Sequence, residues 1–132
     1  MYKRQDEQDI QLGLQVARQL GALDIGQAVV VQDGQVLAVE AAEGTDAMIQ
    51  RLSTIDTYNR SAGLGGVLVK IAKPQQDHRL DLPTIGATTL HHVIEAGLSA
   101  VAIQSEATLL LQRDVCIEVA NDADVALIGV TA

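Results

Sequence analysis

Charged side chains of both signs follow a short apolar segment in the middle of the chain. Residues 67–69 (Val-Leu-Val) predict a buried strand. The segment after it contains six charged or titratable side chains: Lys70, Lys73, Asp77, His78, Arg79 and Asp81. Ligands of open α/β sheets bind beyond the carboxyl ends of the strands, so this position indicates a ligand site. The mixture of charges suits a phosphate group together with a divalent metal ion.

A second acidic cluster also follows an apolar segment. It contains Glu40, Glu43 and Asp46, whose carboxylates are the hard oxygen ligands that Mg²⁺ prefers. Gly44 and Thr45 lie between them at the predicted start of a helix, where backbone N–H groups can bind an anion. A purely structural interpretation is also open, because acidic residues stabilise the positive end of a helix.

The first loop has structural alternatives of its own. Asp77 and Asp81 flank Arg79, so the three could form a surface ion-pair network. Lys70 and Lys73 suit phosphate oxygens, but solvated lysines are common on protein surfaces.

The remaining titratable residues are weaker candidates. His91 and His92 are neighbours on a predicted helix, so they point to different faces and cannot easily share a metal ion. Cys116 lies among apolar helix positions and is expected in the core. The sequence contains no GxSxG, CxxC, Walker A or GxGxxG pattern, which removes the commonest hydrolase, zinc and dinucleotide interpretations.

Helices and strands alternate along the chain and would position these residues. The first helix is predicted over residues 7–20, followed by a hairpin of Ala28–Val31 and Val36–Ala41 around Asp33-Gly34. Later helices are predicted from Thr45 to before Gly63, from Thr88 or Thr89 to Gly97, and over Gln112–Asn121. Later strands are predicted at Val67, at Val101–Ile103, at Thr108–Leu111 and at Val125–Val130. We therefore expect a single α/β domain over residues 1–132, with a mixed, mostly parallel sheet flanked by helices and an early β-hairpin.

Composition limits the classes of function. The net charge is −8 and the sequence pI is about 4.6, which argues against nucleic-acid binding and against an electrostatic grip on anionic lipid. The lone cysteine excludes an internal disulfide and fits a reducing compartment. No apolar run approaches the roughly 18 residues of a membrane span. We expect a cytoplasmic protein with an aliphatic core, since aromatic residues make up only 2% of the chain.

Three long segments resemble a known family. They are DIGQAVVV at 24–31, AVEAAEGTDAMI at 38–49 and VLVKIAKPQQDHRLDLPTIG at 67–86. The closing VANDADVALIGV at 119–130 is similar as well. Together they resemble the C-terminal domain of the LpxI-type UDP-2,3-diacylglucosamine pyrophosphatases, from about Asp9 onward.

The resemblance implies a specific activity. Members of this family depend on Mg²⁺ and hydrolyse UDP-2,3-diacylglucosamine to 2,3-diacylglucosamine 1-phosphate (lipid X) and UMP, a step of lipid A biosynthesis. They have two domains that hold the substrate between them. This chain would be the C-terminal half without its N-terminal domain, and we expect it to be inactive or nearly so by itself. Its expected partners are the nucleotide-lipid substrate and the missing N-terminal domain. The acylated substrate could bring the enzyme to the inner membrane, and a homo-oligomer remains open.

The resemblance also implies roles for the residues of the two loops. Asp77, followed by Asp81, is the best candidate for binding metal or positioning water, and Glu43 and Asp46 are further candidate metal ligands. Phosphate and sugar would be held by a larger set: Lys70, Lys73, Gln76, Arg79, Thr84, Gly44 and Thr45. Two competing interpretations are a non-catalytic module that binds a nucleotide-sugar phosphate, and a domain with charged loops and no ligand.

Overall fold

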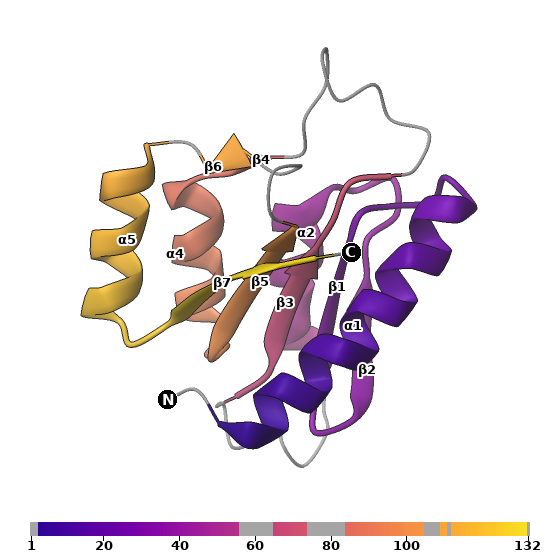
Figure 1. Ribbon diagram of the computed structural model, residues 1–132, viewed down its shortest axis with the longest axis horizontal. Helices are drawn as coiled ribbons and strands as arrows, with labels where there is room; N and C mark the ends of the chain where they lie inside the picture. Colours follow the sequence, from indigo (N-terminus) through magenta and orange to yellow (C-terminus); the bar gives the residue numbers. More distant parts are fainter. Residues whose placement is uncertain (1–2, 56–64, 74–83, 105–108, 111, 132) are drawn as a thin grey trace.

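The computed structural model describes residues 3–55, 65–73, 84–104, 109–110 and 112–131 (Figure 1). Its centre is a five-stranded sheet in the order β2-β1-β3-β5-β7. These strands are β1 Ala28–Gln32, β2 Gln35–Val39, β3 Val67–Lys70, β5 Ala100–Gln104 and β7 Ala126–Val130. A second, two-stranded sheet pairs β4 Thr84–Ile85 with β6 Leu109–Leu110 in parallel.

Helices cover both faces of the larger sheet (Figure 1). The first helix, α1 Arg4–Ala22, packs on one face against β1 and β3, where Ile10, Leu14 and Ala17 meet alternate strand valines. The other face carries α2 Thr45–Gln50, the 3₁₀ helix η1 Arg51–Thr54, α4 Ala87–Glu95 and α5 Arg113–Asp122. Cys116 of α5 is fully buried in this second core, as predicted.

The sheet is mixed, as the sequence predicted. The parallel strands are β3, β5 and β7, and β1 and β2 form the expected antiparallel hairpin. Since β1 is also antiparallel to β3, antiparallel pairing extends one strand beyond the hairpin. No sequence pattern predicted the two-residue strand β4. The helix predicted from Thr45 has α-helical geometry only to Gln50 and continues as a 3₁₀ turn to Thr54.

The tip of the hairpin explains how its register is fixed. Asp33 and Gly34 both have positive φ, at 50° and 78°, as a type I′ turn requires. The buried carboxylate of Asp9 in α1 accepts hydrogen bonds from the backbone N–H groups of Asp33 and Gly34, at 2.9 and 2.8 Å. The helix that covers the sheet therefore also holds the turn.

One edge of the sheet collects the described residues of the two predicted loops. β2, β3 and β5 all end there, and β1 begins there, since Ala28 pairs with Lys70 and Lys70 with Ile103. The amide of Ile71 donates to the carbonyl oxygen of Gln27 at 3.0 Å, which binds the chain after β3 to the chain before β1. We call the side of the sheet at which β2, β3 and β5 end the carboxyl edge.

Candidate active site

Lys70 is the last residue of β3 and, like Glu40, is a buried charged residue at the carboxyl edge. Only 8% of the residue is exposed, and its Nζ donates to the carbonyl oxygen of Thr84 at 2.9 Å. Burial lowers the pKa of the Lys70 ammonium group, while the carboxylates of Glu40 and Asp46 act on that pKa in the opposite direction. The buried ammonium group therefore has two negative charges that offset part of its desolvation.

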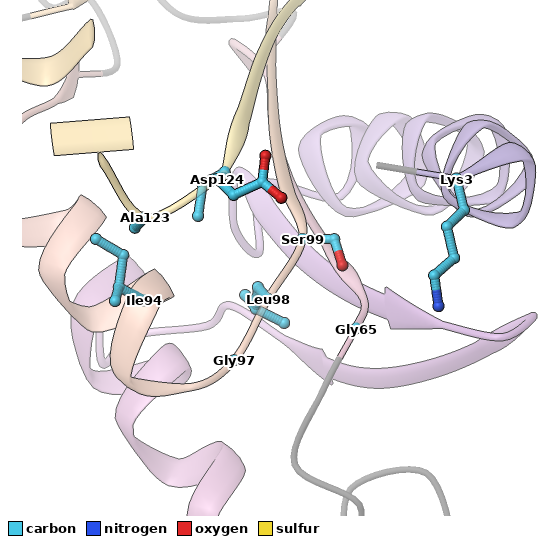
Figure 2. Close-up of a pocket in the computed structure, with 9 residues that line it drawn as sticks. Lys3, Gly65, Ile94, Gly97, Leu98, Ser99, Ala123 and Asp124 are labelled. Atoms are coloured by element: carbon cyan, nitrogen blue, oxygen red, sulfur yellow. The ribbon is translucent and has the colours of Figure 1, made fainter. Parts of the chain in front are cut away.

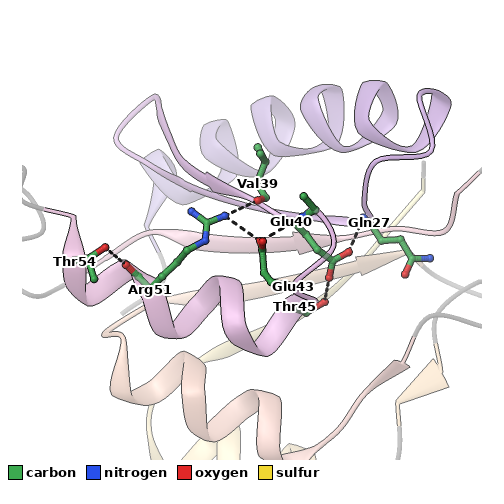
Figure 3. A network of polar contacts seen from close by, with 8 residues as sticks. Gln27, Val39, Glu40, Glu43, Thr45, Arg51 and Thr54 are labelled. Carbon is green, nitrogen blue, oxygen red and sulfur yellow. Dashed lines mark hydrogen bonds and ion pairs between the residues drawn. The ribbon is translucent and has the colours of Figure 1, made fainter.

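Glu40 follows β2 directly and uses both of its carboxylate oxygens within the fold. Oε1 accepts a hydrogen bond from the backbone N–H of Gln27 at 2.8 Å, and Oε2 accepts one from the hydroxyl of Thr45 (Figure 3). These contacts join the end of β2 to the start of β1 and to the first residue of α2. A Cβ at Gly26 would lie 2.1 Å from the carbonyl oxygen of Glu40, so only glycine fits there. Glu40 therefore holds the end of β2, the start of β1 and the start of α2 together at this edge.

Asp46 connects the two helices that begin at this edge. It lies in the first turn of α2, and its Oδ1 accepts a hydrogen bond of 2.6 Å from the hydroxyl of Thr89, in the first turn of α4. Among the described residues, no hydrogen bond is made to its other oxygen, Oδ2. Asp46 thus combines a fixed position with a carboxylate oxygen that could bind a cation.

Glu43 lies at the start of the same helix but has a different partner. Its Oε1 accepts hydrogen bonds from Arg51 Nη2 at 3.1 Å and from the backbone N–H of Ala41 at 3.3 Å (Figure 3). Arg51 also donates to the carbonyl oxygen of Val39 at 2.7 Å. The hydrogen bond from Arg51 is the main cause of a lowered pKa of the Glu43 carboxyl group. This contact gives Glu43 a structural role as the partner of Arg51, which is not the helix-end role that the sequence offered as the alternative.

The other predicted site residues that the structure describes also lie at the carboxyl edge. Lys73 forms an ion pair with Asp24 at 3.0 Å, and its side chain is 28% exposed. Thr84 is exposed at the start of β4, and Gly44 is the N-cap of α2, with a φ of 88°. Gln76, Asp77, His78, Arg79 and Asp81 lie outside the described residues. In the part of the chain that is described, no group of three or more His, Cys, Asp or Glu side chains could hold a metal ion.

Sequence reasoning missed Thr89 as a site residue, and it proposed Glu40 only as an oxygen ligand. Thr89 was expected to begin a helix, but nothing in its local sequence indicates a partner 43 residues away. The structural role of Glu40 depends on its hydrogen bonds with Gln27 and Thr45, which come together with it only in the folded chain.

The opposite edge of the sheet has a pocket of about 350 Å³, at the start of β3, β5 and β7 (Figure 2). It is lined by nine residues, among which Lys3, Ser99 and Asp124 contribute polar side chains. None of the predicted site residues line it. The pocket therefore lies at the opposite end of the strands from the charges around Lys70.

The fold and the charged edge define an α/β domain with a polar site beyond the ends of its strands. The chain belongs to the LpxI family, since it matches the family's C-terminal domain over residues 1–128. It is 44% identical over 124 residues to the UDP-2,3-diacylglucosamine pyrophosphatase LpxI of Caulobacter vibrioides. That match covers 92% of this chain and 44% of the relative, so the chain spans less than half of the relative's length.

Solved structures share the fold at low sequence identity. The Acinetobacter baumannii protein RibD has a TM-score of 0.53 and 11% identity, covering 92% of this chain and 35% of its own. A diaminohydroxyphosphoribosylaminopyrimidine deaminase/reductase from Thermotoga maritima has a TM-score of 0.51 and 16% identity, covering 92% and 36%. At these identities the likeness concerns the fold alone. No helix among the described residues is long and apolar enough to cross a bilayer.

Proposed function

We propose that this chain is the catalytic and substrate-binding C-terminal domain of a Mg²⁺-dependent UDP-2,3-diacylglucosamine pyrophosphatase. The observation that carries the proposal is the 44% identity to a relative of that name over 92% of the chain. The products would be 2,3-diacylglucosamine 1-phosphate and UMP, a step of lipid A biosynthesis. The enzyme would work in the cytoplasm and meet the inner membrane through its acylated substrate.

In our proposal the carboxyl edge supplies the groups that cleavage of a pyrophosphate needs. Cations must hold phosphate oxygens, and a carboxylate must place the attacking water. In our proposal Asp77 places the water or binds the metal ion, and Asp81 supports it. Lys73 and Arg79 hold phosphate oxygens, and Gln76, Thr84 and the backbone N–H groups of Gly44 and Thr45 orient the substrate.

The donor chemistry at the edge fits Mg²⁺. This ion takes one or two carboxylates and keeps several waters. Asp46 provides one fixed carboxylate with Oδ2 unengaged among the described residues, and Asp77 would provide the second. Glu43 is paired through Oε1 with Arg51, whose positive charge would compete with a metal ion, so we place it behind Asp46 as a ligand. Bound Mg²⁺ would neutralise charge on the pyrophosphate oxygens.

The second half of the site would come from an N-terminal domain. The chain spans 44% of its relative, and a substrate with a nucleotide at one end and acyl chains at the other offers two groups to hold. Catalysis depends on holding both ends, so we expect the chain alone to turn over substrate orders of magnitude more slowly than a two-domain protein.

The test is a hydrolysis assay with UDP-2,3-diacylglucosamine. Both products should form in the presence of the two-domain protein and Mg²⁺, should disappear in EDTA, and should return when Mg²⁺ is added in excess. Full activity in EDTA would contradict the metal proposal, and binding without product at any metal concentration would favour a non-catalytic binding module. Equal turnover by the chain alone would contradict the division between two domains.

A further inference from the structure

The pocket at the start of β3, β5 and β7 contains a buried hydroxyl group that the fold does not use. Ser99 lies just before β5 and is 7% exposed. Its backbone N–H donates to the carbonyl oxygen of Gly66 at 2.8 Å, and its own carbonyl oxygen accepts from the N–H of Ala126 at 3.1 Å. No hydrogen bond joins the Ser99 hydroxyl to another described residue. Buried hydroxyls are normally hydrogen-bonded, so this one is available to a molecule inside the cavity of about 350 Å³.

Two side chains of opposite charge line the same pocket. Lys3 is the N-cap of α1, where its backbone N–H donates to Oδ2 of the buried Asp6 at 2.8 Å, and it forms no ion pair with another described residue. Asp124 follows α5 and has another interaction within the chain, but a carboxylate has about four lone-pair sites and can accept further hydrogen bonds. In the view of Figure 2, Ser99 lies between Lys3 and Asp124. The pocket therefore offers an ammonium group, a carboxylate and a hydroxyl.

The rest of the lining is aliphatic or has no side chain. Ile94, Leu98 and Val125 provide an apolar wall. Gly65 and Gly97 have positive φ, at 99° and 76°, and the N–H of Gly65 donates to the carbonyl oxygen of Gly97 at 2.8 Å. Apolar walls with a few placed polar groups are typical of small-molecule sites, and the volume is at the lower end of their range. The occupant should therefore be small and partly aliphatic.

We propose that this pocket binds a small zwitterion with an aliphatic body, the chemical class of the aliphatic amino acids. The ligand carboxylate would accept hydrogen bonds from Lys3 and from the hydroxyl of Ser99, and the ligand ammonium group would donate to Asp124. A ligand with one charge would leave one of the two side chains unmatched, and a phosphate would be repelled by Asp124. The site is at the opposite end of the strands from Lys70, so it does not depend on the proposed pyrophosphatase activity.

Three probes with the same branched apolar group separate the contributions of the two charges. Leucine has both charged groups, isocaproate has only the carboxylate and isoamylamine has only the ammonium group. We expect leucine to cause saturable shifts of the amide NMR signals of residues 97–99 and 123–125 in the ¹⁵N-labelled chain. Its Kd should be roughly 0.1–1 mM, since so small a ligand has few atoms to contribute. Each singly charged probe should bind at least about fivefold more weakly.

Substitutions at the two charges should affect the probes in opposite ways. Lys3→Met should weaken leucine and isocaproate by roughly three- to tenfold and leave isoamylamine unchanged, the modest size reflecting the exposure of both charges. Asp124→Asn keeps a residue that tolerates the positive φ of 57°, and it should weaken leucine and isoamylamine but not isocaproate. Ser99→Ala should weaken leucine by about threefold or more. The matched controls are Arg4→Met and Asp122→Asn, exposed neighbours that do not line the pocket, and both should bind leucine as the wild type does.

The same titrations give the outcomes that would overturn the proposal. These are no saturable shift with leucine, equal affinity for the three probes, or unchanged leucine affinity in both Lys3→Met and Asp124→Asn. Shifts confined to the carboxyl edge would place leucine elsewhere and would overturn it as well. Amide signals far from the pocket report whether each variant folds. Should Asp124→Asn not fold, the three probes and Lys3→Met decide by themselves.

Discussion

The hydroxyl of Thr89 donates a 2.6 Å hydrogen bond to Oδ1 of Asp46 and thereby joins the first turns of α4 and α2. The two residues are 43 positions apart, and Thr89 is 8% exposed. Both helices begin at the carboxyl edge, so the bond sets the position of the candidate ligand Asp46 relative to the chain that leaves β4.

Removing this hydroxyl should weaken the fold without opening a cavity. Thr89→Val keeps the shape of the side chain but leaves a carboxylate oxygen without its donor, so we expect a loss of about 1–3 kcal/mol in the free energy of unfolding. Urea denaturation monitored by circular dichroism measures it. Thr89→Ser keeps the hydroxyl and should lose less, and equal losses in the two variants would show that the hydrogen bond contributes little.

For the substitution Gly13→Ala, helix propensity and core packing predict opposite changes in the free energy of unfolding. In the middle of a helix, replacing glycine by alanine should stabilise by about 1 kcal/mol. A Cβ at Gly13 would lie 2.5 Å from Cγ2 of Val69 in β3, however, so α1 would have to move off the sheet. We therefore expect Gly13→Ala to destabilise by about 1–3 kcal/mol, as overpacked cores do.

The control for this prediction is on the exposed side of the same helix. Gln15→Ala should change the free energy of unfolding by less than about 0.5 kcal/mol. A raised melting temperature in Gly13→Ala would mean that α1 packs less closely on β3 than the structure shows.

The ion pair between Glu43 and Arg51 should be visible in the titration of the folded protein. The folded-state pKa of Glu43 is below its ordinary value of 4.5, chiefly because Arg51 donates to the carboxylate. The stabilisation from this group is therefore present above pH 4.5 and is lost as the pH falls through the lowered pKa. Arg51→Gln should raise the Glu43 pKa, as measured by NMR titration of the side-chain carboxyl carbon. Added salt should raise it in the wild type, because the pair is partly exposed. An unchanged pKa in Arg51→Gln would rule out Arg51 as the cause.

The sequence predicted those elements that are determined locally. The Asp33-Gly34 pair marked the hairpin because few other residues adopt positive φ at both central positions of a turn. Gly97, with a φ of 76°, ended α4 for a similar reason. The valines of β1 and β3 predicted strands because both faces of the sheet are covered.

The remaining features depend on contacts between distant residues. The strand β4 has only two residues, too few for any periodic pattern. The antiparallel pairing of β1 with β3 depends on the path of the whole chain, and so do the bonds from Thr89 to Asp46 and from Lys70 to Thr84. The described candidate residues, such as Glu40, Asp46 and Lys70, lie together at the carboxyl edge, but the sequence could not show which of them make structural contacts there.

The most direct test of the proposed mechanism is the turnover number of Asp77→Ala in the two-domain protein, measured together with its melting temperature. If Asp77 places water or metal, kcat should fall by roughly 10²–10⁴-fold, the usual range for a positioned acid–base group. KM and melting temperature should change little, because the cations that hold the pyrophosphate remain. Asp81→Ala is the companion variant, since a structural ion pair at either position would lower the melting temperature instead. Turnover near that of the wild type in Asp77→Ala would contradict the central assignment and move the search for the catalytic carboxylate to Asp46 and Glu43.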